Sequence, residues 1–487
     1  MKRKSLILIT VDCLRGDRLG MRRGGASITP FLDSLARVGV GISHAIVAGV
    51  PTYFSFPAIM ASRYPLGLGR EVLGIAPGEP SLATVLRESG CATAAFLAGN
   101  PYLSSRYGYA SGFDTFEDFL TPAPGDSPAI QSGQPSGLSS LNRLVRRASS
   151  ATRFTSALYY EAYFRYCQRR SNREEIDVQR LRPYPPAETL VDRACSWLNS
   201  IGNRDFFLWL HFMDAHHPHY PPPEALSAVG ATGMSLKRAR MVNANWNRRE
   251  IDAPQLQRFR EEILTLYDAS VYWVDRQIAR LAEALRAAGM WQDTILAVTA
   301  DHGEEFLEHG ARYHSPWNLP EELVRVPLLI RAPGLAPAHL SEGPFSLIHL
   351  APTLLEGMGF SAPGSFQGKS FWREISEGKL PAGETAIAET VEVSDNPTET
   401  PSRIHPRVLM VREQRYKLVL HFSQKSDELF DLQEDPAEEG AINGELSRPV
   451  RARLLQSARE HLRRSRQARD TKLALRARLR QMRQTAK

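Results

Sequence analysis

Cysteine is scarce in this chain of 487 residues, and it does not occur in the spacings that organise a small domain. The four cysteines are Cys13, Cys91, Cys167 and Cys195, and no two of them form a CxxC pair. A chain of this length can bury a core of its own without disulfide bonds. The scarcity argues against a disulfide scaffold or a zinc ribbon, and we expect reduced thiols.

Long apolar runs are missing as well. The N-terminus is basic, as in a signal peptide, but the apolar run that starts at Leu6 is interrupted by Thr10 and Asp12. That run is too short for the apolar region of a signal peptide. No other run approaches the roughly 20 apolar residues that a membrane span requires. We therefore expect a soluble enzyme of the cytoplasm.

A net positive charge is absent from most of the chain and is confined to its end. The net charge is +7, but residues 451–487 alone carry +11, so the remainder carries −4. Leu475, Leu479 and Met482 follow helical spacing among arginines in this tail. The pattern predicts a basic amphipathic helix that contacts an anionic membrane or nucleic acid, or a helix that is only solvated.

Short apolar runs rich in β-branched residues alternate with helical patterns, which predicts a doubly wound α/β sheet. The longest helical pattern runs from about Glu261 to Ala288. Ligands of open α/β sheets bind at the carboxyl ends of the strands. The predicted strands are Leu6 to Val11, Ala92 to Ala98, Phe206 to Phe212, Thr294 to Thr299 and Val326 to Ile330.

Changes in amino-acid composition along the sequence divide the chain into three parts. We expect a catalytic domain over 1–375, a small C-terminal α+β subdomain over 376–445 and a basic helical tail over 446–487. Within the first part, 121–182 is rich in Pro, Gly and Ser and then basic and aromatic, with Tyr159, Tyr160, Tyr163 and Phe164. It is interpreted as an insertion that forms a substrate lid, or as a surface linker with a packed helix.

Polar residues follow three of the predicted strands. Asp12 ends the first strand, His216 follows the strand near Phe212, and Asp301-His302-Gly303 ends the strand near Val298. An adjacent carboxylate and imidazole can bind one cation, and a glycine lets the backbone approach it. The alternatives are a helix-capping Asp12 and an ordinary polar turn at Asp301.

These segments resemble the sulfatase branch of the alkaline phosphatase superfamily, and the resemblance covers most of the chain. It implies an alkaline-phosphatase-like mixed sheet and a hydrolase or transferase of phosphate-type or sulfate esters. The matching segments are Val11-Asp12 with Leu14-Arg15, Met60 to Pro65, Gly112 to Phe116, Asp214 to Pro218, Asp301 to Glu304, Val324 to Pro327, Ala351 to Thr353, Glu428 to Leu432 and Asp435-Pro436.

The main departure from the family pattern concerns the nucleophile. Sulfatases carry a cysteine, matured to formylglycine, ahead of the stretch that corresponds to Arg63-Tyr64-Pro65. Counting back places Thr52 at that position, so formylglycine cannot form. The resemblance then favours a threonine that attacks phosphorus and forms a phosphothreonine, as in phosphodiesterases and phosphoethanolamine transferases. A helix N-terminus at Thr52 would favour a phosphate anion, although Thr52 could also only cap it. Ser55 is the alternative nucleophile.

The resemblance also implies the metal ligands. The family's first strand often ends in paired aspartates, but the second position is Cys13 here. The resemblance therefore implies only Asp12, Asp301 and His302 as metal ligands, with the Thr52 hydroxyl as a further ligand. We expect one divalent ion, and the donor set suits Zn²⁺, Mn²⁺, Mg²⁺ or Ca²⁺ alike.

Four further residues receive predicted roles. His216 and His314 align with family residues that contact the transferring group, and either could protonate the departing alcohol. Asn100 resembles an asparagine that binds a non-bridging oxygen, or it is a turn residue before proline. Arg15 faces the anion or forms a structural salt bridge. His217, His219 and His309 are interpreted as scaffold or surface residues.

Three functions remain open at this point. The first is a threonine-dependent hydrolase or transferase of phosphate or phosphonate esters and diesters. The second is a sulfuric ester hydrolase. The third is a non-catalytic binding protein on the same scaffold that acts through its basic tail. Retention of Asp12, Asp301 and His302 favours an enzyme.

Overall fold

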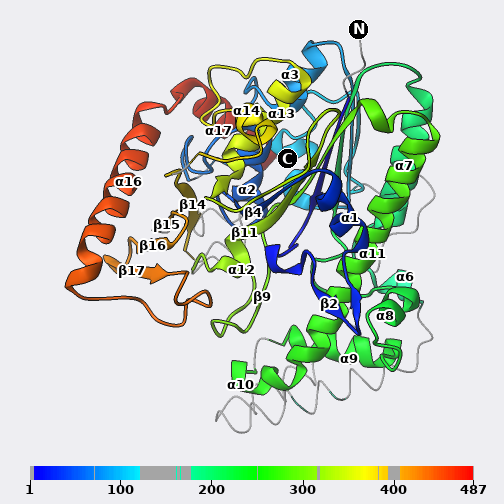
Figure 1. The fold of residues 1–487 in the computed structure, drawn as a ribbon, viewed down its shortest axis with the longest axis horizontal. Coiled ribbons are helices and arrows are strands. Elements are labelled where there is room, and N and C mark those ends of the chain that lie inside the picture. Colours follow the sequence, from blue (N-terminus) through cyan, green and yellow to red (C-terminus); the bar gives the residue numbers. More distant parts are fainter. Residues whose placement is uncertain are drawn as a thin grey trace.

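The computed structural model describes residues 5–70, 72–120, 161, 165, 177–248, 251–314, 318–381, 383–392 and 406–485. A mixed sheet of nine strands forms the centre (Figure 1). β13 (Phe345–Ser346) pairs with one end of β4 and lies outside the main strand order. The other strands of the sheet lie side by side in the following order. They are β12 (Ala338–Leu340), β4 (Val40–Ile46), β11 (Arg325–Arg331), β8 (Thr294–Ala300), β1 (Ser5–Val11), β7 (Phe206–Phe212), β5 (Ala92–Leu97) and β6 (Thr115–Glu117).

The five strands predicted from apolar runs are β1, β5, β7, β8 and β11, so the predicted fold class is confirmed. Every residue of β1, β7 and β8 is buried, as expected for parallel strands covered on both faces. β1 lies between β7 and β8 and is parallel to both. β11 is antiparallel to β4 and β8, which makes the sheet mixed.

Helices cover both faces of this sheet (Figure 1). α11 (Arg260–Ala287) corresponds to the long predicted helix and packs against α1 (Pro30–Val38) and α7 (Ala187–Ser200). On the other face, α13 (Leu350–Met358) packs against α2 (Thr52–Ala61) and α3 (Leu82–Glu88). Shorter helices are α6 (Val178–Leu181), α8 (Pro223–Ala228), α9 (Leu236–Trp246), α10 (Ala253–Leu256), α12 (Glu321–Val324) and α14 (Trp372–Ser376).

A second, antiparallel sheet follows in the C-terminal part, as predicted. Its strands are β14 (Ala386–Val391), β15 (Arg407–Arg412), β16 (Tyr416–His421) and β17 (Ser426–Asp431). α16 (Arg448–Gln467) packs Leu454 and Ala458 onto this sheet (Figure 1). The domain boundary predicted at 375 falls in the last turn of α14, and the one at 445 falls directly before α16.

The basic tail is helical, as the spacing of its apolar residues predicts. α17 (Thr471–Thr485) returns to the catalytic domain and packs Ala474 and Ala477 against Leu68, Val72 and Ala76. Its contact with a membrane or nucleic acid stays a prediction, and so does the cytoplasmic location. No helix in the described part of the chain is long and apolar enough to cross a bilayer. The predicted lid lies largely outside the described residues.

One buried carboxylate joins the two helices α1 and α11. Asp275 of α11 accepts hydrogen bonds from the backbone N–H groups of Phe31 and Leu32, at 2.9 and 2.8 Å, and so caps the first turn of α1. Burial raises the pKa of Asp275 to about 7. The free amides at a helix N-terminus need such an acceptor when they are buried.

We predict that Asp275→Ala lowers the free energy of unfolding by about 1–3 kcal/mol, because both amides lose their acceptor. Asp275→Asn should lose less, since one acceptor remains. The folded pKa lies above the unfolded value of about 3.9. Stability from this group therefore falls as pH rises from about 4 to 7, and Asp275→Asn should remove that slope. Urea unfolding of both variants across pH tests this, and equal losses would contradict it.

Candidate active site

The carboxyl ends of β1 and β8 place two carboxylates side by side. Val11 pairs with Ala300 in the parallel register, so the next residues, Asp12 and Asp301, are neighbours at the same edge of the sheet. Both side chains are completely buried. The sequence predicted that the residues after these strands lie at one edge of the sheet, and β1 and β8 are indeed adjacent and parallel.

His302 turns a ring nitrogen toward this pair. Its Nε2 lies 3.8 Å from Asp12 Oδ1 and 3.6 Å from Asp301 Oδ2. Its Nδ1 lies 2.8 Å from the carbonyl oxygen of Gly303 and donates to it. That hydrogen bond leaves the Nε2 lone pair facing the carboxylates, which is the usual arrangement of a metal-binding histidine.

Thr52 completes the cluster. It is the first residue of α2 and lies 95% buried. Its hydroxyl oxygen is 3.2 Å from His302 Nε2 and 3.5 Å from Asp12 Oδ2. The sequence predicted that Thr52 would stand at a helix start among the metal ligands, and the structure brings these four residues together.

The separations within the cluster suit a shared cation better than direct hydrogen bonds. Metal–nitrogen and metal–oxygen bonds of about 2.0–2.2 Å at a tetrahedral angle separate neighbouring ligand atoms by about 3.3–3.6 Å. The measured separations are 3.2–3.8 Å. Asp301 Oδ2 is also buried without a hydrogen-bond partner. Buried carboxylates are ordinarily paired or bound to metal, so these residues fit a divalent ion.

The charges of the cluster are coupled. Burial raises the pKa of Asp12, but its hydrogen bond with His211 and the nearby imidazoles of His216 and His302 outweigh burial and hold it below its usual range. Burial and the charge of Asp12 raise the pKa of Asp301. Burial and His314 lower the pKa of His302 to about 4, so its ring is neutral near pH 7 and can act as a ligand.

Two residues orient Asp12. Asn100 donates from Nδ2 to Asp12 Oδ2 at 3.0 Å, and Tyr102 N donates to Asn100 Oδ1. Asn100, predicted to bind a substrate oxygen, thus contacts the predicted metal ligand Asp12 and also forms the turn that was its alternative role. The sequence interpretation missed His211, whose Nε2 lies 3.3 Å from Asp12 Oδ2. A single imidazole in the otherwise apolar β7, paired with Thr10 of β1, is the signal that could have found it.

Cys13 projects into the same region because the chain turns sharply after Asp12. Its φ of 62° is left-handed, which a residue with a side chain adopts only where its surroundings enforce it. Tyr267 of α11 donates its hydroxyl to the Cys13 carbonyl at 2.8 Å and accepts from Arg15 N. The Sγ atom lies 3.1 Å from Asp12 Oδ1. Neither Cys13 nor Tyr267 received a functional role from the sequence.

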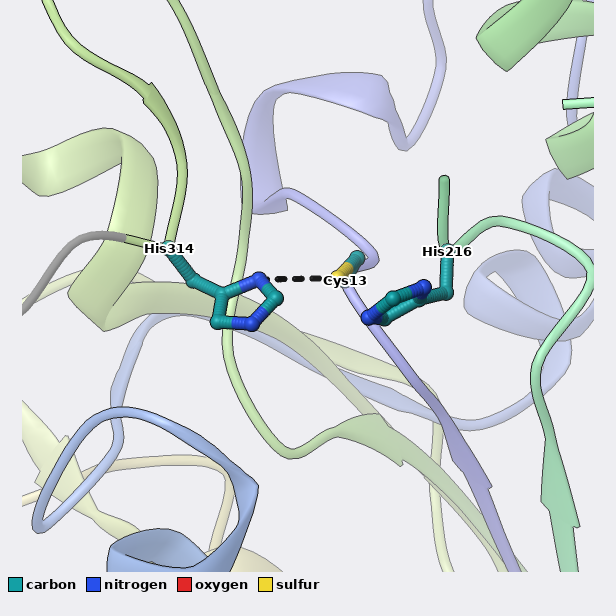
Figure 2. Close-up of side chains that lie close together, drawn as sticks. All are labelled: Cys13, His216 and His314. Carbon is teal, nitrogen blue, oxygen red and sulfur yellow. Dashed lines mark hydrogen bonds between the residues drawn. The ribbon is translucent and has the colours of Figure 1, made fainter. Parts of the chain in front are cut away.

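His216 and His314 lie beside the cluster, with Cys13 between them (Figure 2). The rings of His216 and His314 are 5.4 Å apart, and that of His314 is 4.6 Å from His302. His314 Nδ1 also lies 3.5 Å from a carboxylate oxygen of Glu304. Burial raises the pKa of Glu304, but the hydrogen bond and charge of His314 outweigh it and lower the value to about 2.

Arg15 forms salt bridges, which was the structural one of its two predicted roles. Its guanidinium pairs with Asp17 at 2.7 Å and with Glu308 at 2.6 Å, and it donates to the Glu304 carbonyl. A guanidinium held in this way supports the loop after β8 instead of facing an anion. Ser55 Oγ is buried with no hydrogen-bond partner, and His219 is buried against Tyr267.

Comparison with known proteins agrees with this geometry. The sulfatase family model matches residues 4–360, and that of the C-terminal part of N-sulphoglucosamine sulphohydrolase matches residues 308–467. An endo-4-O-sulfatase of Bacteroides thetaiotaomicron is 28% identical over 50% of the chain, which corresponds to about half (49%) of that protein's length. The multifunctional alkaline phosphatase superfamily protein PehA of Trinickia caryophylli is 22% identical, with 91% of this chain and 92% of PehA covered.

Solved structures share the fold. The phosphonate monoester hydrolase of Silicibacter pomeroyi superposes with a TM-score of 0.63 at 20% identity, covering 96% of both chains. BT4656, in complex with its substrate D-glucosamine-2-N,6-O-disulfate, superposes with a TM-score of 0.66 at 17% identity, covering 96% of this chain and 99% of that one.

The mixed sheet has the fold of ester hydrolases of the alkaline phosphatase superfamily, to which the chain is similar. Within that class, the chain belongs to the sulfatase family. Sulfatases and alkaline-phosphatase-like enzymes use a divalent metal, and the described residues include candidate metal-binding groups.

We predict that a divalent ion raises the thermal stability of the wild-type protein, because it neutralises the buried pair Asp12 and Asp301. Saturation at about 100-fold over the dissociation constant stabilises by about 2.7 kcal/mol. Asp301→Asn should lose most of this increase. Glu283→Gln, which changes an exposed carboxylate of α11, should keep it. Thermal unfolding with and without a chelator measures the effect, and an equal increase in Asp301→Asn would disprove the assignment.

Proposed function

We propose that this sulfatase-family hydrolase cleaves phosphate or phosphonate esters and diesters with Thr52 as the nucleophile. The observation that carries the proposal is the position of the Thr52 hydroxyl, 3.2 Å from His302 Nε2 and 3.5 Å from Asp12 Oδ2. A hydroxyl in that position would share the cation of the cluster, and Thr52 is the first residue of the buried helix α2. The relatives named for phosphonate monoesters and for multifunctional activity support this substrate class.

The chemistry of threonine favours phosphorus over sulfur. A sulfatase releases sulfate because its hydrated aldehyde carries a second hydroxyl that expels the sulfate and re-forms the aldehyde. Thr52 has one hydroxyl and cannot follow that route. A phosphoryl group on threonine can instead be released by direct attack of water on phosphorus. A threonine at position 52, in place of the family's cysteine, therefore suits the site to phosphate-type esters instead of sulfate esters.

The proposed reaction has two steps. In the first, Thr52 Oγ bonds to phosphorus while the bond from phosphorus to the alcohol oxygen breaks, and the proton of the Thr52 hydroxyl passes, in the net balance, to the departing alcohol. In the second, a water oxygen bonds to phosphorus and the bond to Thr52 Oγ breaks, which restores the hydroxyl. An alcohol in place of water in the second step would make the enzyme a phosphotransferase.

The residues of the site divide this work. Asp12, Asp301 and His302 would hold the cation, which would lower the pKa of the attacking hydroxyl and offset charge on phosphorus oxygens. His211 and Asn100 position Asp12. His216 and His314 lie on the Cys13 side of the cluster and offset the charge that develops on the departing oxygen.

Sulfate ester hydrolysis is the second candidate. It is favoured by the sulfatases among the relatives, including the endo-4-O-sulfatase and the disulfate-binding BT4656. A non-catalytic role on this scaffold is disfavoured because Asp12, Asp301, His302 and Thr52 lie together in one cluster. The two catalytic candidates differ in which ester is turned over faster.

Replacement of Thr52 tests the nucleophile. Thr52→Ala should lower kcat for an aryl phosphodiester or phosphonate monoester by at least about 10³-fold, as loss of a nucleophile does elsewhere. Metal content should stay unchanged, because Asp12, Asp301 and His302 remain. Thr52→Ser keeps the hydroxyl and should retain part of the activity, and Ser55→Ala is the matched control. Turnover by Thr52→Ala at the wild-type rate would rule the proposal out.

A substrate panel separates the two candidates. With the leaving phenol held constant, we expect kcat/KM for the phosphodiester or the phosphonate monoester to exceed kcat/KM for the sulfate ester. The measurement is phenol release by the wild-type enzyme with Zn²⁺, Mn²⁺, Mg²⁺ or Ca²⁺ added in turn. A preference for the sulfate ester that disappears in Thr52→Ala would establish the second candidate instead.

A further inference from the structure

A second group of metal-type donors lies next to the catalytic cluster. Cys13 from the turn after β1, His216 from the loop after β7 and His314 from the segment after β10 (Arg312–Tyr313) converge there (Figure 2). Their three donor atoms all lie within 4.8 Å of one another. Cys13 Sγ and His314 Nδ1 are 3.7 Å apart. Cys13 is fully buried.

The donor types and their spacing suit zinc. One thiolate and two imidazoles are typical ligands of Zn²⁺, whereas Mg²⁺ and Ca²⁺ prefer oxygen. Zinc–sulfur and zinc–nitrogen bonds of about 2.3 and 2.0 Å at the tetrahedral angle separate the two ligand atoms by about 3.5 Å. The distance of 3.7 Å from sulfur to nitrogen is close to that value.

The His216 ring is fixed in the orientation that a ligand needs. Its Nδ1 lies 2.6 Å from the carbonyl oxygen of His217, so Nδ1 carries the hydrogen and donates it. The lone pair is then on Nε2. A histidine that ligates metal through one nitrogen usually donates from the other to a carbonyl or carboxylate. His302 of the first cluster shows the same arrangement with the carbonyl of Gly303.

Glu304 offers a fourth donor. Its side chain is almost completely buried, and Oε2 lies 3.5 Å from His314 Nδ1. Zinc–nitrogen and zinc–oxygen bonds of about 2.0 Å at the tetrahedral angle separate these atoms by about 3.3 Å. A thiolate and a carboxylate together would balance the charge of a divalent ion held beside the buried Cys13 and Glu304.

We propose that Cys13, His216 and His314 bind a second divalent ion, Zn²⁺ by its donor set, beside the ion of Asp12, Asp301 and His302. The sequence predicted a single ion. This inference rests on the proposed function, because it specifies how His216 and His314 offset charge on the departing oxygen. Two neighbouring ions that flank the attacking and leaving oxygens are a recurrent solution for in-line displacement at phosphorus.

Metal titration of the full chain tests this inference without an activity measurement. Metal-free protein is titrated with Zn²⁺, and binding is counted by calorimetry and elemental analysis. A second titration with Co²⁺ follows the near-ultraviolet absorption of a thiolate–cobalt bond. We expect two equivalents and a thiolate band in the wild type. Cys91→Ser, which changes a buried cysteine at the opposite edge of the sheet, is the matched control and should behave as the wild type does.

The variants separate the two sites. His216→Ala and His314→Ala should bind the second equivalent at least tenfold more weakly, and Cys13→Ser should also lose the thiolate band. Asp301→Asn should weaken the first equivalent and keep the band, because the thiolate belongs to the other ion. Circular dichroism and thermal unfolding of each apo protein show whether it folds.

The thiolate could instead bind the first ion, because the donor atoms of Asp12, Cys13 and His302 also lie within 4.8 Å of one another. If the thiolate binds the first ion, the wild type will bind one equivalent, and Asp301→Asn will weaken the band together with that ion. Either result overturns the proposal, as would two equivalents retained in Cys13→Ser. Thr52→Ala should bind both ions as the wild type does, so failure of the nucleophile assignment is distinguishable from failure of the second site.

Discussion

The burial of two neighbouring carboxylates is the constraint on which the rest of the site depends. Asp12 and Asp301 are both fully buried at the carboxyl ends of adjacent parallel strands. Within the described residues, their ion-pair partners are imidazoles, and no lysine or arginine pairs with either of them. Buried charges of one sign are strongly destabilising unless they are neutralised. A divalent cation would neutralise this charge, and the surrounding groups include candidate ligands for one.

The fold explains why these groups meet. β1 lies between β7 and β8, so the residues after all three strands emerge at one edge. α2 begins at the same place and supplies Thr52. Tyr267 reaches across from α11 and fixes the turn that carries Cys13. Residues far apart in the sequence thereby form one site, with the proposed nucleophile Thr52 in the first cluster and nitrogen and sulfur donors on its flank.

Much of the sheet could be predicted from the sequence. Strands buried on both faces read as continuous apolar runs, and β7 agrees with its predicted run at both ends. β4 was missed because Gly41, Ser43 and His44 interrupt its apolar pattern. The antiparallel direction of β11 was also not visible, since strand direction depends on how the connections cross and not on the residues of the strand itself.

The site was predictable to the extent that it follows strand ends and family motifs. Asp12, Asp301, His302 and Thr52 came from those signals, and the structure brings them together. His211 was missed because it lies inside a strand and contacts Asp12 only through strand pairing. The proximity of Cys13 to His216 and His314 depends on a left-handed turn and on loops whose course the sequence does not reveal.

The most direct test of the central claim is to trap the covalent intermediate. The wild-type enzyme is mixed with an activated aryl phosphodiester or phosphonate ester, quenched in acid during turnover, digested and examined by mass spectrometry. The account predicts a phosphoryl- or phosphonyl-derived adduct on the hydroxyl of Thr52. An adduct on Ser55, or turnover with Thr52 unmodified under conditions that trap a control phosphoenzyme, would contradict it.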